Sequence, residues 1–287
     1  MHGWYTSSMS AIDMLARQAA NRDTWLRDVV QHLEHDGQFS AAWLVGSLAD
    51  GSADGLSDID LFVVIDDRDA EAFLQRSTQE VARFGQIVWL KAIPGNAPSG
   101  GAYMSVGVQS SPLPISVDWY WQPLRQAVLP RDARWLFQHR SIPKAEPPAS
   151  FAELMSRQHP PLASHEDPSG PSDLDRLAFF WAMVPVAAKY GARGWDEKAG
   201  RILDGLEEQV DRLSAPGGRN RVLVEVTAPL QRLRLLMDAI DGLTPTLRAR
   251  GVVAPDTSYA YAFVHLAEEL EKEVWHGSAG RPAKRVS

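Results

Sequence analysis

The first part of the chain alternates between two hydrophobic periods. Apolar residues recur at helical spacing over residues 11–33, which predicts an amphipathic helix. Short apolar runs at 41–45 and 58–65 are typical of buried strands. A second helix is predicted over 68–84, followed by three more strands at 86–92, 102–109 and 114–121. We therefore expect an α/β (α+β) fold in which a small mixed sheet carries packed helices.

The pattern changes after about residue 140. Prolines gather there, and proline fixes φ and removes a backbone donor, so a domain connection is predicted. From residue 172 onward the pattern is helical, with Ser172 followed by Asp175 as N-cap chemistry for the first helix. The predicted helices cover 174–190, 196–213, 220–240 and 259–275. The expected domains are 1–145, with the sheet, and 146–287, an all-α helical bundle.

Composition narrows the possible classes of protein. The chain is 45% hydrophobic and 23% charged, which is typical of soluble globular proteins. No apolar run approaches the roughly 20 residues that span a bilayer, and residues 1–10 lack the features of a secretory signal. A cytoplasmic protein without membrane association is therefore expected. With no cysteine, disulfides, zinc–thiolate sites and thiol nucleophiles are excluded.

The formal net charge of -7 bears on the partner. Proteins that bind nucleic acid usually present a basic surface to the phosphates, so nucleic acid is a poor candidate. Long-range attraction instead favours a cationic or neutral small molecule.

The most informative residues are two aspartates in the second predicted strand. Asp58 and Asp60 are two positions apart, so their side chains project from the same side, roughly 7 Å apart. Two neighbouring carboxylates repel each other, and a divalent cation relieves this repulsion. Magnesium prefers carboxylate and water oxygens and leaves positions for substrate phosphates.

A third carboxylate lies in the last predicted strand. Asp118 is on the face opposite Val117 and Trp119. If this strand neighbours the strand of Asp58 and Asp60, the three carboxylates meet on one patch. Such a patch can hold two Mg²⁺ ions about 3.5–4 Å apart, one at the attacking hydroxyl and one at a triphosphate.

A glycine and a serine end the first predicted strand. Gly46 allows the backbone to approach a phosphate closely, and Ser47 adds a hydroxyl donor. This pair precedes Ser57-Asp58-Ile59-Asp60-Leu61 by a loop rich in Gly, Ser and Asp.

At these residues the sequence resembles the nucleotidyltransferase superfamily, which includes DNA polymerase β, poly(A) polymerases and antibiotic nucleotidyltransferases. The family signature is an apolar strand, Gly-Ser, a loop of this length, Asp-x-Asp between apolar residues, and a later Asp on another strand. The matching positions are Gly46, Ser47, Asp58, Asp60 and Asp118. The resemblance implies that the three aspartates are catalytic metal ligands and that Gly46 and Ser47 bind the nucleotide.

The order of elements is similar to the two-domain, aminoglycoside adenylyltransferase-like branch. That resemblance implies ATP or another NTP as the donor, and a hydroxyl of a small molecule as the acceptor. Members often carry a basic residue shortly after Gly-Ser, whereas this chain has Asp50 there. Lys189, near the end of a predicted helix, resembles a family lysine that reaches nucleotide phosphates. The alternative for Lys189 is a surface lysine at a helix C-terminus.

The sequence thus predicts a Mg²⁺-dependent enzyme that transfers AMP from ATP to a small hydroxylated acceptor such as an aminoglycoside-type antibiotic. Two alternatives stay open. One is a nucleotidyltransferase acting on protein or tRNA, as in a toxin–antitoxin pair. The other is a non-catalytic nucleotide-binding regulatory protein of the same fold.

Overall fold

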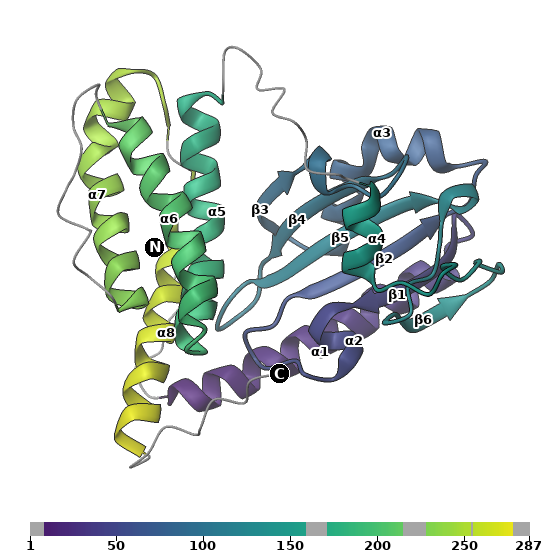
Figure 1. Cartoon of the computed structure of the whole chain (residues 1–287), viewed down its shortest axis with the longest axis horizontal. Coiled ribbons are helices and arrows are strands. Elements are labelled where there is room, and N and C mark those ends of the chain that lie inside the picture. Colours follow the sequence, from purple (N-terminus) through teal and green to yellow (C-terminus); the bar gives the residue numbers. More distant parts are fainter. Residues whose placement is uncertain (1–8, 159–170, 215–227, 254, 278–287) are drawn as a thin grey trace. The chain divides into compact units, whose positions relative to one another are not determined.

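A computed structural model describes residues 9–158, 171–214, 228–253 and 255–277. The chain forms two compact units (Figure 1). The sheet unit comprises Asp13–His165, and the helical unit comprises Met1–Ile12 together with Glu166–Ser287.

The sheet unit is built on six strands in the order β3-β4-β5-β2-β1-β6. Neighbouring strands are antiparallel except for β2 and β5, which run parallel. The predicted mixed sheet is therefore confirmed, and the five predicted strands all form. The strands are β1 (Phe39–Val45), β2 (Ile59–Ile65), β3 (Ile87–Ala92), β4 (Ala102–Val108), β5 (Ile115–Pro123) and β6 (Arg134–Gln138).

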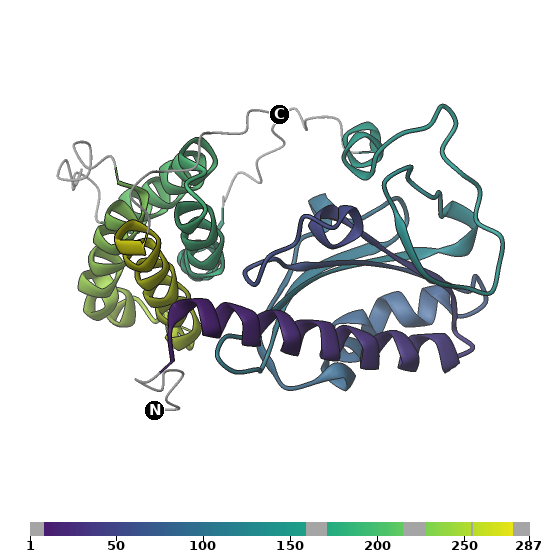
Figure 2. The same ribbon diagram turned by 90° about the horizontal axis from the view of Figure 1, so that it is seen from below.

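The helices of this unit lie on both faces of the sheet. Figure 2 shows α1 and α3 on one face and α4 on the other. The predicted helix over 68–84 is divided, since α3 ends at Glu80 and a 3-10 turn follows. The elements are α1 (Ala11–His35), α2 (Gly46–Asp50), α3 (Ala70–Glu80), η1 (Val81–Phe84), η2 (Pro94–Asn96), η3 (Leu124–Gln126) and α4 (Phe151–Gln158).

Strand β6 is not predicted from the sequence. It pairs with the edge of β1, with Trp135 opposite Trp43 and Phe137 opposite Ala42. Only Phe137 of its residues is buried, so β6 lacks the apolar alternation that marks a half-buried strand. Its pairing with β1 determines its conformation more than its own sequence does.

Contacts with the sheet continue past the expected domain boundary at 145/146, which stays a prediction. The Phe151 ring, at the start of α4, lies 4.9 Å from the Tyr120 ring and 6.2 Å from the Phe62 ring. The backbone before it also bonds back to the sheet unit, since Arg131 N–H donates to the Ala149 carbonyl at 2.9 Å. The proline-rich stretch up to α4 therefore packs with the sheet, and this unit extends to His165.

The described part of the helical unit contains α5 (Asp173–Ala192), α6 (Asp196–Leu213), α7 (Pro229–Ala249) and α8 (Ser258–Gly277). The predicted N-cap is confirmed, because Ser172 and Asp175 form a reciprocal capping box at α5. Helix α7 begins at Pro229 and continues past residue 240 through Pro245. The first part of the predicted 220–240 helix, residues 220–227, lies outside the described residues.

Two apolar layers hold the sheet unit together. On the face of α1 and α3, helix residues such as Val29 and Phe73 pack on Ile59, Leu61 and Val63 of β2. On the opposite face, a smaller cluster includes Trp43, Phe62, Val64, Tyr103 and Tyr120. Neither unit contains, in its described residues, a helix with the length and apolarity needed to cross a bilayer.

Candidate active site

Two of the three predicted aspartates are direct neighbours in the sheet. Asp60 of β2 is the register partner of Asp118 of β5. Adjacent strands lie about 4.8 Å apart and paired residues project from the same face, so the two carboxylates stand side by side. The alternate residues Ile59 and Leu61 face the core under α1 and α3. Asp58 immediately precedes β2 and is half-buried.

Gly46 lies directly against Asp60. Its backbone has φ +65°, and a Cβ at this position would come within 2.5 Å of Asp60 Oδ2. Two independent requirements therefore favour glycine: the left-handed backbone and the space taken by the carboxylate. Val45, the residue before it, is the register partner of Asp60.

Helix α2 begins at Gly46 and includes Ser47, which is half-buried. No side chain caps the start of this helix, because the N-cap residue is Val45. The predicted turn after β1 is thus a short helix whose first residue touches Asp60. Phosphate binding by Gly46 and Ser47 stays a prediction.

Two tyrosines lie beside the aspartates on the same face. The Tyr103 hydroxyl is hydrogen bonded to the Asp118 carboxylate. Burial first, then the charges of Asp118 and Asp60, raise the pKa of Tyr103 well above its ordinary value. Burial likewise raises the pKa of Tyr120, to which the charges of Asp118, Asp60 and Asp58 all contribute. The negative charges of all three aspartates therefore act on one tyrosine hydroxyl.

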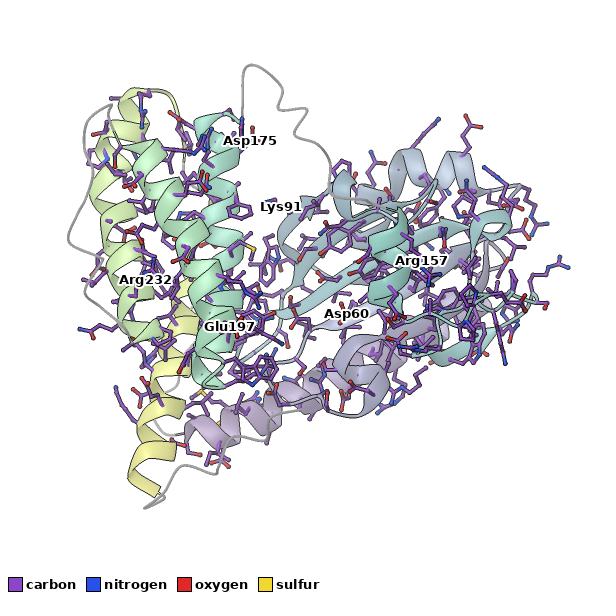
Figure 3. All side chains as sticks on the ribbon, viewed as in Figure 1. Asp60, Lys91, Arg157, Asp175, Glu197 and Arg232 are labelled. Atoms are coloured by element: carbon purple, nitrogen blue, oxygen red, sulfur yellow. The ribbon has the colours of Figure 1, made fainter. Side chains whose placement is uncertain are left out.

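A row of paired residues crosses the sheet through Asp118. Lys91 of β3 pairs with Ser105 of β4, and Ser105 pairs with Asp118, which pairs with Asp60. Lys91 therefore projects from the face of the aspartates, two strand spacings (about 10 Å) from Asp118. Asp60 and Lys91 are labelled in Figure 3. Nothing in the local sequence marks Lys91, so the sequence analysis missed it.

Asp50 replaces the basic residue that is frequent after Gly-Ser. In the structure its carboxylate accepts a hydrogen bond of 2.8 Å from Ser52 N–H. Hydrogen bonds from Ser52 lower the pKa of Asp50. The exposed aspartate thus closes the turn between α2 and the following loop.

Lys189 belongs to the helical unit, in the last turn of α5. Lys189 is only 3% exposed. The alternative of a lysine on the protein surface is therefore wrong. Its predicted role in nucleotide binding is untested by this observation.

Within the described residues, no group of three or more histidine, aspartate or glutamate side chains is close enough to form a complete ligand set. Mg²⁺, however, is commonly bound through one or two carboxylates, with water and substrate phosphates as further ligands. The adjacent carboxylates of Asp60 and Asp118 fit that requirement. The two-ion arrangement stays a prediction.

A comparison with known families agrees with this site. The family model described as a nucleotidyltransferase domain matches residues 26–95. The match includes Gly46, Ser47, Asp58 and Asp60. This match supports a relation to the nucleotidyltransferase superfamily. Nucleotidyl transfer, a transfer of a phosphorus-containing group, is accordingly the activity of this enzyme. No curated protein matches the chain in sequence.

The matched region covers only part of the sheet unit. It ends before β4 and β5, so Asp118 and Tyr103 lie outside it. The link between the matched motif and Asp118 comes instead from the parallel pairing of β2 with β5.

Proposed function

We propose that the enzyme is a Mg²⁺-dependent nucleotidyltransferase that transfers AMP from ATP to a hydroxyl of a small molecule. The observation that carries this proposal is the register pairing of Asp60 with Asp118, beside the close contact between Gly46 and Asp60. Phosphoryl-type transfer depends mainly on positioning and on neutralising negative charge. A pair of carboxylates beside a glycine turn supports both requirements.

In this proposal Asp58, Asp60 and Asp118 hold divalent ions. Bound ions would neutralise the triphosphate and lower the pKa of the acceptor hydroxyl. The hydrogen bond from Tyr103 orients the carboxylate of Asp118. Asp118 is the residue we assign to the acceptor side, where its carboxylate can receive the hydroxyl proton.

The nucleotide contacts proposed for the sheet unit centre on the glycine–serine turn. Gly46 permits close approach of a phosphate, and the Ser47 hydroxyl can donate to it. Lys189 is the candidate cation from α5. Lys91, on the same sheet face as the aspartates, is a second candidate because Asp50 provides no positive charge.

The acceptor is proposed to be a hydroxylated, cationic compound of the aminoglycoside type. The net charge of -7 favours a cation over a polyanion such as RNA. The helical unit that follows the sheet unit supports the resemblance to the two-domain, aminoglycoside adenylyltransferase-like branch.

The experiment that tests this function incubates the full chain with each NTP, Mg²⁺ and a panel of aminoglycosides, with mass spectrometry of the products. An acceptor heavier by one AMP is expected, together with release of pyrophosphate. Chelation by EDTA and Asp60→Asn should both abolish the product. Asp28→Asn, an exposed carboxylate on α1, is the matched control and should leave it unchanged.

Two results would contradict the proposal. Label from the NTP appearing on protein or tRNA instead of a small molecule would show a macromolecular acceptor. Metal-independent binding of NTP without any product, unchanged in Asp60→Asn, would show a non-catalytic protein.

A further inference from the structure

Helix α1 carries buried polar side chains that point to a role in the site. Gln18 is 5% exposed and Arg22 is 6% exposed, although α1 otherwise buries an apolar face. Buried polar groups are costly unless they are hydrogen bonded. Their partners are therefore informative about what α1 does.

Arg22 holds the loop that leads into the Asp58–Asp60 motif. Its Nη1 donates to the Asp54 carbonyl at 2.5 Å and to the Ser57 carbonyl at 3.4 Å. Its remaining donors contact the neighbouring Asp23, with Nε at 3.0 Å from Oδ1. Ser57 directly precedes Asp58, so this guanidinium acts on the backbone next to the first aspartate.

The same loop touches the backbone of α1. A Cβ on Gly55 would come within 2.4 Å of the Leu15 carbonyl oxygen, so only glycine allows the loop to lie this close. The loop is also closed internally, since Ser57 Oγ is 3.0 Å from both Asp54 N and Asp54 Oδ1. It is therefore held against α1 as a compact turn.

Gln18 and Asn21 hold the segment that leads into β5. Gln18 Nε2 donates to the Pro114 carbonyl at 3.2 Å, and Leu113 N–H donates to Gln18 Oε1 at 3.2 Å. One turn further along α1, Asn21 Nδ2 donates to the Ser111 carbonyl at 2.5 Å. Strand β5 begins at Ile115, directly after Pro114, and carries Asp118.

Helix α1 therefore forms hydrogen bonds to both segments that precede the parallel pair, the loop before β2 and the segment before β5. We propose that Gln18, Asn21 and Arg22, the α1 clamp, are positioning residues that fix the carboxylates of β2 relative to Asp118. The inference rests on the proposed metal-dependent function. Its physical basis is that residues around a metal site, which do not bind the metal themselves, orient the side chains that do.

A role limited to stability would make a different prediction. Removing one partner of a buried hydrogen bond costs about 1–3 kcal/mol, because the other partner is left unsatisfied, so every variant should lose some stability. If the α1 clamp served only to hold the fold together, an apolar replacement would leave metal binding of the folded protein intact. If it positions the aspartates, metal binding weakens even where the fold survives.

The test uses the full chain with Gln18→Leu, Arg22→Ala and the milder Gln18→Asn and Arg22→Lys, which keep an amide and a positive charge, respectively. Arg27→Ala, an exposed arginine on the same helix, is the matched control. Three quantities are measured: Mn²⁺ affinity by electron paramagnetic resonance, hydrogen exchange of the two loops without metal, and AMP transfer.

Arg22→Ala should speed exchange at residues 51–57, and Gln18→Leu at residues 111–114. Each should lower Mn²⁺ affinity and transfer about 10- to 100-fold. Arg22→Lys and Gln18→Asn should show smaller losses in the same direction, and Arg27→Ala no loss. These milder variants give the answer if the larger replacements fail to fold.

The positioning role of the α1 clamp is refuted if the folded variants bind Mn²⁺ and transfer AMP as the wild type does, whatever their melting temperatures. A wild-type enzyme that neither binds Mn²⁺ nor transfers AMP refutes the proposed function instead, and the inference that depends on it. The two failures are therefore separated by the wild-type measurement alone.

Discussion

The two faces of β2 and β5 differ sharply although they are built from alternate residues of the same strands. The face under α1 and α3 presents Ile59, Leu61 and Val63, with Trp119 and Trp121 beside them, all fully buried. The opposite face presents Asp60 beside Asp118, followed by Phe62 beside Tyr120. On that second face, polar chemistry lies at one end and aromatic packing at the other.

This difference shows how one sheet can carry a buried apolar face and a candidate active site on its opposite face. The apolar face supplies the stability, and the two-residue period of the strand projects the carboxylates from the other face. A change on one face should therefore affect stability, and a change on the other should affect activity. The following predictions test that separation, beginning with the largest effect.

Asp60→Asn should reduce AMP transfer about 1000-fold, roughly 4 kcal/mol of transition-state stabilisation, because one of the proposed metal ligands loses its charge. Without metal, the protein should unfold at the same or a slightly higher temperature. Removing one of two adjacent like charges relieves a repulsion of up to about 1 kcal/mol. Steady-state kinetics and thermal unfolding check the two halves, and a clear drop in melting temperature would contradict the separation of the faces.

Leu61→Ala, on the opposite face, should behave in the reverse way. Truncating a fully buried leucine costs about 2–5 kcal/mol of unfolding free energy. Transfer per folded molecule, measured well below the melting temperature, should stay within a few-fold of the wild type. Urea denaturation gives the first quantity, and a large loss of transfer in folded protein would link the two faces.

Gly46→Ala should combine both effects. The left-handed backbone alone costs a non-glycine residue about 1–2 kcal/mol, and the added Cβ would also displace the Asp60 carboxylate. Gly51→Ala is the matched control, because its φ is +79° and a Cβ there would meet nothing within 4 Å. Both variants should lose stability, but only Gly46→Ala should also weaken Mn²⁺ binding. Equal metal affinity in the two would remove the argument that Gly46 supports Asp60.

Tyr103→Phe should have the smallest effect. It removes one hydrogen bond to Asp118, worth about 1 kcal/mol, so transfer should fall by less than 10-fold. The raised pKa of Tyr103 has a second consequence. Above about pH 10 the unfolded chain loses the tyrosine proton while the folded protein keeps it, so stability falls as pH rises.

That alkaline decrease should be shallower in Tyr103→Phe, because one of the tyrosines that retain their proton is gone. Urea denaturation at pH 8 to 11 measures the slope. An identical slope in the variant would show that Tyr103 titrates normally in the folded protein.

Most of the sheet could be predicted from the sequence, because apolar alternation and turn residues are local signals. The pattern also indicated the glycine–serine turn and the Asp58–Asp60 pair, since the spacing is short. The domain boundary at 145/146 stays a prediction; proline density marks the connection in the sequence, whereas the packing of Phe151 on Tyr120 leaves no local signal.

The remaining features depend on pairing between distant segments. The sequence left open whether β5 neighbours β2, and the register of Asp118 with Asp60 became visible only in the structure. Lys91 could not be predicted for the same reason, since it is related to Asp118 only through the pairing of both residues with Ser105 of β4. β6 was missed because an edge strand with mostly exposed residues has no periodic apolar signal.

The parallel pairing of β2 and β5 also determines when the site can exist. Parallel strands cannot be joined by a tight turn, and here α3, β3 and β4 intervene. Contacts between segments far apart in the chain form slowly, because the intervening loop must be closed first. The aspartate pair can therefore form only after β5 has been synthesised, so the site depends on two strands that are distant in the chain.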